Sequence, residues 1–294
     1  MAREKDTRLR IAKPDIIGLF ETLPKRVFDR SEIATILEEN RDYWRLTAST
    51  GRNYFITYLI QNTPLTEHRF DFPNAPRLKY TWGNLSPLEV VITLDENAYC
   101  SHLTAMFVHN LTEQIPRSIY LNVEQPAKST QTGSLTQDSI DAAFKRPQRV
   151  TKNVAEYEGY RVYLLSGKFT DNAGVVRIMD PNGVTLRVTN IERTLIDIVV
   201  RPAYAGGPSN ILKAYEMAAG LASVNKMTSL LGELAYTYPY HQAIGFYLDR
   251  SGSYSEAATE LMRKFKIEFD FYLVHGMKEM DYDEKWHLYY PKGL

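Results

Sequence analysis

The sequence contains little of several features that would point to a specific class of protein. Its 294 residues include one cysteine, Cys100, so an internal disulfide framework and a zinc site built from several cysteines are both excluded. No apolar run approaches the roughly 18 residues of a membrane-spanning helix. The first residues are polar and lead into no apolar run, so they predict no secretory signal. We therefore expect a cytoplasmic protein without a membrane partner.

Sequence motifs of enzyme chemistry are missing as well. The chain has no glycine-rich phosphate loop, no HExxH and no G-x-S-x-G. His102 and His109 are seven residues apart on an expected helix and share a face, yet no further metal ligands stand near them in the sequence. We expect packing or hydrogen-bonding roles for both, and neither a metal site nor a cofactor.

Two other features invite a catalytic interpretation. Cys100 has no identifiable partner that would activate it, so a small core residue is the simpler interpretation. The acidic residues Asp281, Asp283 and Glu284 carry ligands that Mg²⁺ prefers, which keeps a metal-dependent nuclease open as an alternative. Neighbouring carboxylates form no ordered site by themselves, so a solvated turn is favoured. We expect no catalytic residues and no enzyme activity.

Composition and length indicate an ordinary globular protein of two domains. Apolar residues make up 44% of the chain and charged residues 24%. The net charge is zero, but residues 1–82 hold 14 Lys and Arg against 11 Asp and Glu, and residues 83–294 hold 21 against 24. The first part is therefore weakly basic, which permits nucleic-acid binding without requiring it. Gly83-Asn84 is the expected boundary.

The first 82 residues predict three helices followed by a β-hairpin. Pro14 suits the start of the first helix, and Asp29 with Glu32 forms a capping box for the second. The third helix is expected over residues 49–61, and two short strands over 65–70 and 77–82. This order is typical of a winged helix-turn-helix domain, which places its third helix in the major groove of DNA.

The polar face of this third helix is the best candidate for reading DNA. Asn and Gln side chains contact adenine edges, and Thr methyl groups contact thymine. Arg52 lies at the edge of the face and suits a phosphate contact. The other members of the face, on one side of a helical wheel, are Thr50, Asn53, Tyr54, Thr57 and Gln61.

Basic residues elsewhere in this segment are expected to contact phosphates. Arg77 and Lys79 alternate with apolar residues on the second strand of the hairpin, so both point to its exposed side. A loose basic arm is expected from Arg3, Lys5, Arg8 and Arg10. Winged helices also serve as protein–protein adaptors, and the modest basic charge leaves that alternative open.

The remaining 212 residues predict a mixed α/β domain with a helical C-terminal part. Residues 125–139 are the most loop-like stretch, and Asp180-Pro-Asn-Gly183 is a strong hairpin signal. The expected helices cover about 87–94, 97–111, 191–200, 211–218, 224–234, 240–250 and 255–265. The expected strands cover 118–123, 160–165, 175–178, 185–188, 267–274 and 286–290. The whole chain therefore belongs to the α+β class.

Several stretches of this second part resemble the AbiEi antitoxin family. The most specific match is the run from Leu186 to Asp197, LRVTNIERTLID, followed by RPAYAGG from Arg201 to Gly207. Residues 98–120 resemble the helix and first core strand of that family. AIGFYLDRSG, from Ala243, resembles its late helix with Asp249 in place of a Glu, and residues 286–291 resemble its closing strand. The matches occur in order over residues 95–291.

The resemblance implies an antitoxin of a bacterial toxin–antitoxin system linked to abortive phage infection. Family members join an N-terminal winged helix, here residues 1–82, to an antitoxin domain, here residues 83–294. They repress their own operon by binding inverted repeats in promoter DNA. They also counteract AbiEii, a nucleotidyltransferase-like toxin, directly or functionally. A transcription regulator or phage-defence component without such a toxin remains an alternative.

The most specific motif also has a physical interpretation. Thr189 or Asn190 is expected to cap a helix, and Glu192 falls in its first turn, where the helix dipole favours an acid. Arg193 and Asp197 stand four residues apart and are expected to pair. A structural ion pair explains the motif, and a role in toxin control is the alternative for Glu192, Arg193 and Asp197.

Overall fold

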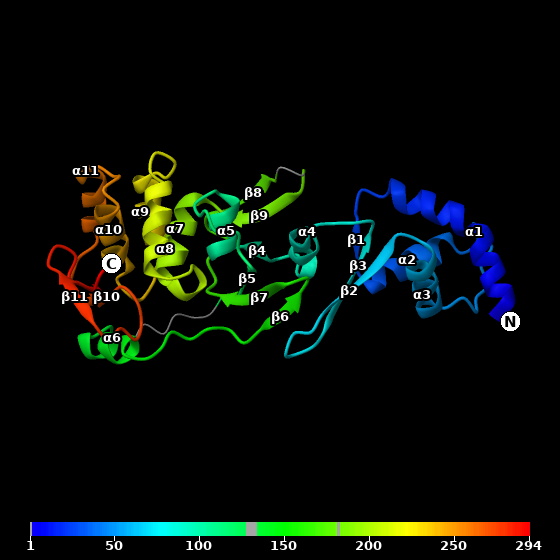
Figure 1. Ribbon diagram of the computed structural model, residues 1–294, viewed down its shortest axis with the longest axis horizontal. Coiled ribbons are helices and arrows are strands. Elements are labelled where there is room, and N and C mark those ends of the chain that lie inside the picture. The colour runs from blue at the N-terminus through cyan, green and yellow to red at the C-terminus, as the bar shows by residue number, and fades with distance from the viewer. Residues whose placement is uncertain (1, 128–133, 181–182) are drawn as a thin grey trace. The chain divides into compact units, whose positions relative to one another are not determined.

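A computed structural model describes residues 2–127, 134–180 and 183–294. The chain is an α+β protein. It divides into two compact units (Figure 1), the first comprising Met1–Glu96 with Ala155–Glu158 and the second Asn97–Val154 with Gly159–Leu294. The first unit thus extends past Gly83 as far as Glu96. Within the described ranges, no helix has both the length and the apolar character that crossing a membrane requires.

The first unit packs three helices against a small antiparallel sheet. Its elements are α1 (Ala2–Thr22), β1 (Val27–Phe28), α2 (Arg30–Asn40), α3 (Arg52–Asn62), β2 (Leu65–Phe70) and β3 (Arg77–Trp82). The strand order is β1-β3-β2, so β3 is central. Helices and sheet enclose one core, in which the rings of Phe20 and Trp82 stack with centroids 4.6 Å apart.

The start of α2 is as predicted, whereas α1 is much longer than expected. The Glu32 carboxylate accepts the backbone N–H of Asp29 at 2.7 Å, which completes the capping box. α1 begins at Ala2 and contains Pro14 in its interior, so the expected start near Pro14 is wrong. The reason is an apolar stripe at spacings of three and four residues, buried in the core: Leu9, Ala12, Ile16 and Phe20.

The expected loose basic arm is therefore part of a helix. Arg8 donates to the backbone carbonyl of Arg45 at 3.0 Å, and Arg10 is exposed. The side chains of Arg3 and Lys5 lie outside the described residues. After β3 come α4 (Pro87–Val91), whose start is capped by Ser86, and the 3₁₀ turn η1 (Ile92–Leu94).

A mixed sheet forms one half of the second unit. Within this unit the strand order is β7-β5-β4-β9-β8. β5 runs parallel to β7 and β4 parallel to β9, whereas β4–β5 and β8–β9 are antiparallel. The strands are β4 (Tyr99–Cys100), β5 (Ser118–Glu124), β7 (Tyr160–Gly167), β8 (Val175–Met179) and β9 (Thr185–Thr189). The β8–β9 hairpin confirms the expected pairing, although Pro181 and Asn182 of its turn lie outside the described residues.

Three short elements between residues 97 and 160 were not foreseen. The expected helix over 97–111 is shorter, because β4 precedes α5 (His102–Val108). The expected loop 125–139 ends in α6 (Gln137–Phe144), and its residues 128–133 lie outside the described ones. β6 (Val154–Tyr157) is the third, and its residues from Ala155 onward group with the first unit. Elements of two to eight residues are too short to show a repeating hydrophobic pattern from which a helix or strand could be predicted.

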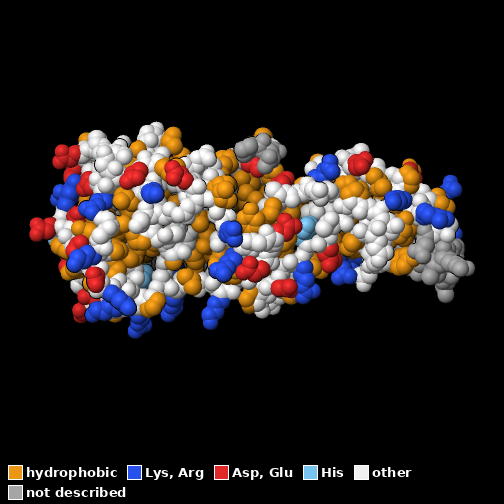
Figure 2. Space-filling view, viewed as in Figure 1, with side chains coloured by type: hydrophobic (Ala, Val, Ile, Leu, Met, Phe, Trp, Pro, Cys, Tyr) orange, Lys and Arg blue, Asp and Glu red, His pale blue; other side chains and the backbone are white. Residues whose placement is uncertain are grey.

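The other half of the second unit is helical, as predicted. The core of this half brings together α7 (Ile191–Val200), α8 (Pro208–Met217), α9 (Val224–Leu234), α10 (Tyr240–Arg250), α11 (Glu256–Thr259) and η3 (Glu260–Lys264). A small sheet in the order β10-β12-β11 completes it, from β10 (Phe271–Tyr272), β11 (Met280–Asp283) and β12 (Leu288–Pro291). Figure 2 shows acidic and basic side chains interspersed over the face of this unit that is turned to the viewer.

Candidate functional site

α3 of the first unit presents an exposed polar face opposite a buried apolar one. Phe55, Ile56 and Leu59 are buried in the core of the first unit. The helix starts at Arg52, after Gly51, rather than at residue 49. Because the apolar residues fix the rotation of the helix, its opposite face points to solvent.

Four of the predicted DNA-reading residues lie on this exposed face: Arg52, Asn53, Thr57 and Gln61. Asn53 accepts a hydrogen bond at Oδ1 from the Arg30 guanidinium of α2, at 2.5 Å. Arg30 therefore adds a cation beside Asn53, which the sequence reasoning did not find. Its position one residue after the capping residue Asp29 gave no sign that α2 would place it against α3.

Thr50 and Tyr54 do not belong to the exposed face, so their prediction is wrong. Thr50 is only 1% exposed. Its backbone carbonyl accepts from the Arg41 guanidinium at 3.2 Å, and its hydroxyl lies 3.3 Å from that of Thr47. Tyr54 is half-buried and packs against the core. The helical wheel assumed that the helix includes residue 50, but the chain turns there.

Arg77 and Lys79 are also placed differently from the prediction. Lys79 is buried, with Nζ 2.8 Å from the Asp29 carboxylate. Arg77 donates to the carbonyl of Leu94 at 2.7 Å and lies over the ring of Phe72. Lys79 is not exposed because β1 pairs with β3 in a register that places Asp29, the residue after β1, opposite Lys79. Both cations instead hold parts of the first unit together.

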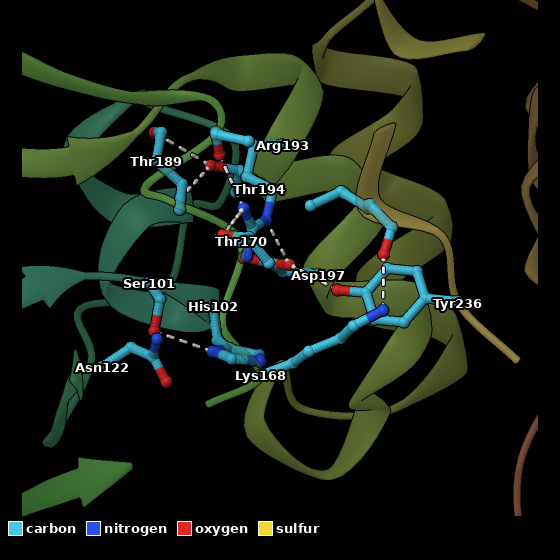
Figure 3. A network of polar contacts seen from close by, with 12 residues as sticks. Ser101, His102, Asn122, Lys168, Thr170, Thr189, Arg193, Thr194, Asp197 and Tyr236 are labelled. Carbon is cyan, nitrogen blue, oxygen red and sulfur yellow. Dashed lines mark hydrogen bonds and ion pairs between the residues drawn. The ribbon is translucent and has the colours of Figure 1, made fainter. Parts of the chain in front are cut away.

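The second candidate is a buried polar network at the start of α7 (Figure 3). Asn190 caps this helix by accepting the backbone N–H of Arg193 at 2.8 Å, as one of the two predicted caps. Arg193 and Asp197 are 4% and 5% exposed, and Nε of the arginine lies 2.7 Å from Oδ1 of the aspartate. The predicted pair is confirmed. The pair is buried rather than exposed, so removal of either partner would leave an uncompensated charge in the interior.

Arg193 connects α7 to the strand region as well. Its Nη1 donates to the carbonyl of Ala173 at 2.6 Å and to the Thr170 hydroxyl at 3.2 Å. Burial alone would lower the pKa of Arg193, but the attraction of Asp197 outweighs that effect and the pKa is raised. The guanidinium therefore stays charged, and its N–H groups donate to a carboxylate, a carbonyl and a hydroxyl.

Glu192 fixes the neighbouring helix. It is buried, and its carboxylate accepts the backbone N–H of Ser223 at 3.0 Å, next to the start of α9. On the other side of α7, the hydroxyls of Thr189 and Thr194 lie 2.8 Å apart. The three motif residues are thus inside the molecule, where they join α7 to its surroundings.

The network forms one wall of a cavity of about 740 Å³, and the described residues that line it all belong to the second unit. His102 lines the same cavity and is 7% exposed. It has a positive φ of 50° at the turn between β4 and α5, and its Nδ1 lies 2.9 Å from the Ser101 hydroxyl. Burial lowers the pKa of His102 to about 4, so its ring is neutral at physiological pH.

The residues weighed for catalysis are placed apart from one another. His109 does not join His102, because its Nε2 contacts the carbonyl of Thr189 at 2.6 Å. Burial raises the pKa of the Cys100 thiol to about 12, so the thiol stays protonated. Asp281 and Asp283 lie in β11 rather than in the expected turn, and Asp283, at the end of the strand, accepts the backbone N–H of Trp286 at 2.9 Å. In the part of the chain that the structure describes, no three His, Cys, Asp or Glu side chains gather as metal ligands would.

The late-helix motif has a packing explanation. Gly245 of α10 lies against the ring of the fully buried Trp286, and a Cβ at this position would stand 2.3 Å from that ring. One turn later, Asp249 accepts the indole N–H of the same tryptophan at 2.7 Å and lies 2.8 Å from Lys285. Two separate stretches of the resemblance therefore meet at a single side chain.

Comparison with known proteins gives a likeness of fold. The chain matches no protein-family model and no curated protein. Its fold is similar to the crystal structure of the RV2827C protein from Mycobacterium tuberculosis, with a TM-score of 0.62. The match covers 95% of this chain and 90% of that one, at 16% sequence identity. At this identity the likeness concerns the fold, and it extends over both units.

Proposed function

We propose that this protein binds duplex DNA through its first unit and acts as an antitoxin of the AbiEi type through its second. The observation that carries the DNA-binding part is the exposed polar face of α3. Arg52, Asn53, Thr57 and Gln61 share this face, with Arg30 beside them. Asn and Gln suit base edges in the major groove, and the two arginines suit phosphates or guanine.

The order of elements in the first unit supports the same proposal. Helix, short strand, two helices and a two-stranded hairpin, with the sheet order β1-β3-β2, are the parts of a winged helix-turn-helix. In such a domain α3 is the recognition helix and the β2–β3 hairpin is the wing. Because Arg77 and Lys79 are engaged within the unit, we assign phosphate contacts to Arg30 and Arg52 instead.

The antitoxin part of the proposal depends on the resemblance of residues 186–207 and the stretches in order around them. Glu192, Arg193 and Asp197 are buried, so their contribution is to build the domain rather than to touch a partner. The proposed partners are promoter DNA with inverted repeats and a nucleotidyltransferase-like toxin of the AbiEii type, in the cytoplasm. We propose no enzymatic activity. A regulator without such a toxin would use the same DNA-binding unit.

Gel shifts on the promoter of the protein's own operon test the DNA-binding part. Asn53→Ala with Thr57→Ala should weaken specific binding by about 1–3 kcal/mol for a lost base contact. Binding to unrelated DNA should change much less, since it depends on phosphate contacts. Thr22→Ala, an exposed threonine of α1, is the matched control and should bind as the wild type does. Equal operator binding by the double variant would remove α3 from the proposal.

The same double variant separates the two proposed roles. Expressed at full length from an inducible promoter, it should still protect cells from a nucleotidyltransferase encoded beside it, although it no longer represses the operon. If the wild-type chain gives no protection, the antitoxin part is wrong and a DNA-binding regulator remains.

A further inference from the structure

We propose that the cavity of the second unit binds a nucleotide, that is, a phosphorylated ligand with a flat heterocyclic ring. The cavity has a volume of about 740 Å³, within the range of roughly 300–1,000 Å³ typical of small-molecule sites. Its lining comes from several separated segments of one compact unit, including β5, β7, α5, α7 and the residues that follow them. This inference is independent of DNA binding and of toxin control.

The charge of the lining points to an anion. Arg149, Lys168 and Arg201 line the cavity, and among the described residues none of the three lies within 4 Å of a carboxylate. Lys168 donates instead to the backbone carbonyls of Leu234 and Ala235, at 2.8 and 2.7 Å, which carry no net charge. The positive charges therefore remain available to a ligand.

The one acidic side chain of the lining does not offset this charge. Asp197 is held by Arg193 at 2.7 Å, and these two opposite charges cancel locally. His102 adds no charge, because its pKa is lowered to about 4 by burial. With Nδ1 engaged by Ser101, its other ring nitrogen is left as a neutral hydrogen-bonding group in the cavity wall. After the Arg193–Asp197 pair is set aside, the three cations Arg149, Lys168 and Arg201 remain, and they fit a phosphorylated group.

Aromatic side chains in the same lining suit a flat ring. Phe169 lines the cavity and is 44% exposed, unusually open for a phenylalanine. Tyr236 also lines it, with Lys168 Nζ 5.5 Å from the centre of its ring. Tyr204 lines it too, but it is only 7% exposed and packs against His102 and Tyr120, so Phe169 is the ring on which a ligand would stack. Stacking on such side chains is worth about 1–3 kcal/mol per base in nucleic-acid sites, and it tolerates all bases.

Cations together with an exposed ring, that of Phe169, distinguish a nucleotide from simpler anions. Inorganic phosphate would use the arginines and leave Phe169 in water. An uncharged nucleoside would stack but leave three cations unpaired. A nucleotide satisfies both parts of the lining, so its affinity should exceed that of either fragment.

Isothermal titration calorimetry on the full-length protein tests the proposal, with ATP, GTP, CTP and UTP as probes. At least one should bind with a dissociation constant below 1 mM, and more tightly than tripolyphosphate or the matching nucleoside. Arg201→Ala and Phe169→Ala should each weaken binding at least tenfold. Arg177→Ala, which removes an exposed arginine of β8 outside the cavity, should leave it unchanged. Circular dichroism confirms that each variant is folded.

Three outcomes would overturn the proposal. The first is no heat of binding for any of the four nucleotides at 1 mM. The second is equal affinity for tripolyphosphate and the nucleotides, which would leave the aromatic half without a role. The third is binding that Arg201→Ala and Phe169→Ala do not change while Arg177→Ala does, which would place the ligand elsewhere. Lys168→Met, a substitution of similar length, provides a second test of the charged half.

Discussion

α3 of the first unit and α7 of the second carry similar numbers of polar residues but use them in opposite ways. On α3, Arg52, Asn53 and Thr57 are exposed, and the residues of the helix that face the core are Phe55, Ile56 and Leu59. On α7, Arg193 and Asp197 are buried and bonded to each other, and Arg193 also bonds to the segment between β7 and β8. A polar residue on a helix is therefore available to a partner molecule in one unit and part of the interior in the other.

The difference follows from what covers each helix. α3 has the sheet and helices of its small unit on one side only, so half of its surface remains in water. α7 is enclosed by β9, α8, α9 and α10, so even its polar positions are inside. Inside a protein, each charge needs a partner, and the arginine finds three.

The largest expected effect comes from breaking the buried pair. Arg193→Met should lower the free energy of unfolding by about 3–5 kcal/mol, because Asp197 is left buried without its counter-charge. Arg52→Met on α3 should change it by less than about 0.5 kcal/mol, as expected for an exposed position. Urea unfolding followed by circular dichroism measures both.

Replacing both partners sharpens this comparison. Arg193→Met combined with Asp197→Leu should be less destabilised than the sum of the single variants, since no unpaired charge remains. Additive losses would mean that the pair contributes only packing.

Two helical glycines, one in each unit, differ in the space available for an added methyl group. Gly245→Ala in α10 should destabilise the protein by about 1–3 kcal/mol, because the added methyl meets the buried ring of Trp286. Gly18→Ala in α1 has open space around the new Cβ and should stabilise it by about 0.5–1 kcal/mol. Thermal unfolding monitored by circular dichroism should move in opposite directions for the two variants. A shift of the same sign in both would show that helix propensity, rather than contact with Trp286, decides.

Two buried histidines should make the stability of the second unit depend on pH, and this effect is smaller than that of breaking the buried pair. The pKa values of His102 and His241 are lowered by burial to about 4 from 6.5, so the unfolded chain binds their protons first. Stability is therefore fully present above pH 6.5 and is lost as the pH falls toward 4. Between pH 6.5 and 5.5 each histidine should contribute a loss of about 1 kcal/mol.

Urea unfolding at the two pH values, with His102→Asn, checks this dependence. Asparagine tolerates the positive φ of this position, and it does not titrate. The variant should lose about 1 kcal/mol less on acidification than the wild type. His287→Asn, at a half-exposed position, is the control and should retain the wild-type dependence. An unchanged dependence in His102→Asn would show that its ring is not held neutral.

Local patterns in the sequence determined much of this protein. The capping box of Asp29 and Glu32, the Asn190 cap, the apolar face of α3 and the Arg193–Asp197 spacing each involve residues within a few positions of one another. The helices from residue 191 onward follow the same rule, because each presents several turns of a regular apolar stripe. Helix caps, helix faces and four-residue spacings follow from the regular geometry of the helical backbone, so they can be predicted from neighbouring residues.

Only the tertiary structure decided which polar residues are accessible. The two-residue strand β1 is too short to be predicted from its sequence pattern, yet its pairing with β3 places Asp29 next to Lys79. Arg30 meets Asn53 across 23 positions of sequence. The cavity of the second unit gathers residues from His102 to Tyr236. Burial and charge at these places depend on which distant segments come together, and the period of a helix or strand carries no information about that.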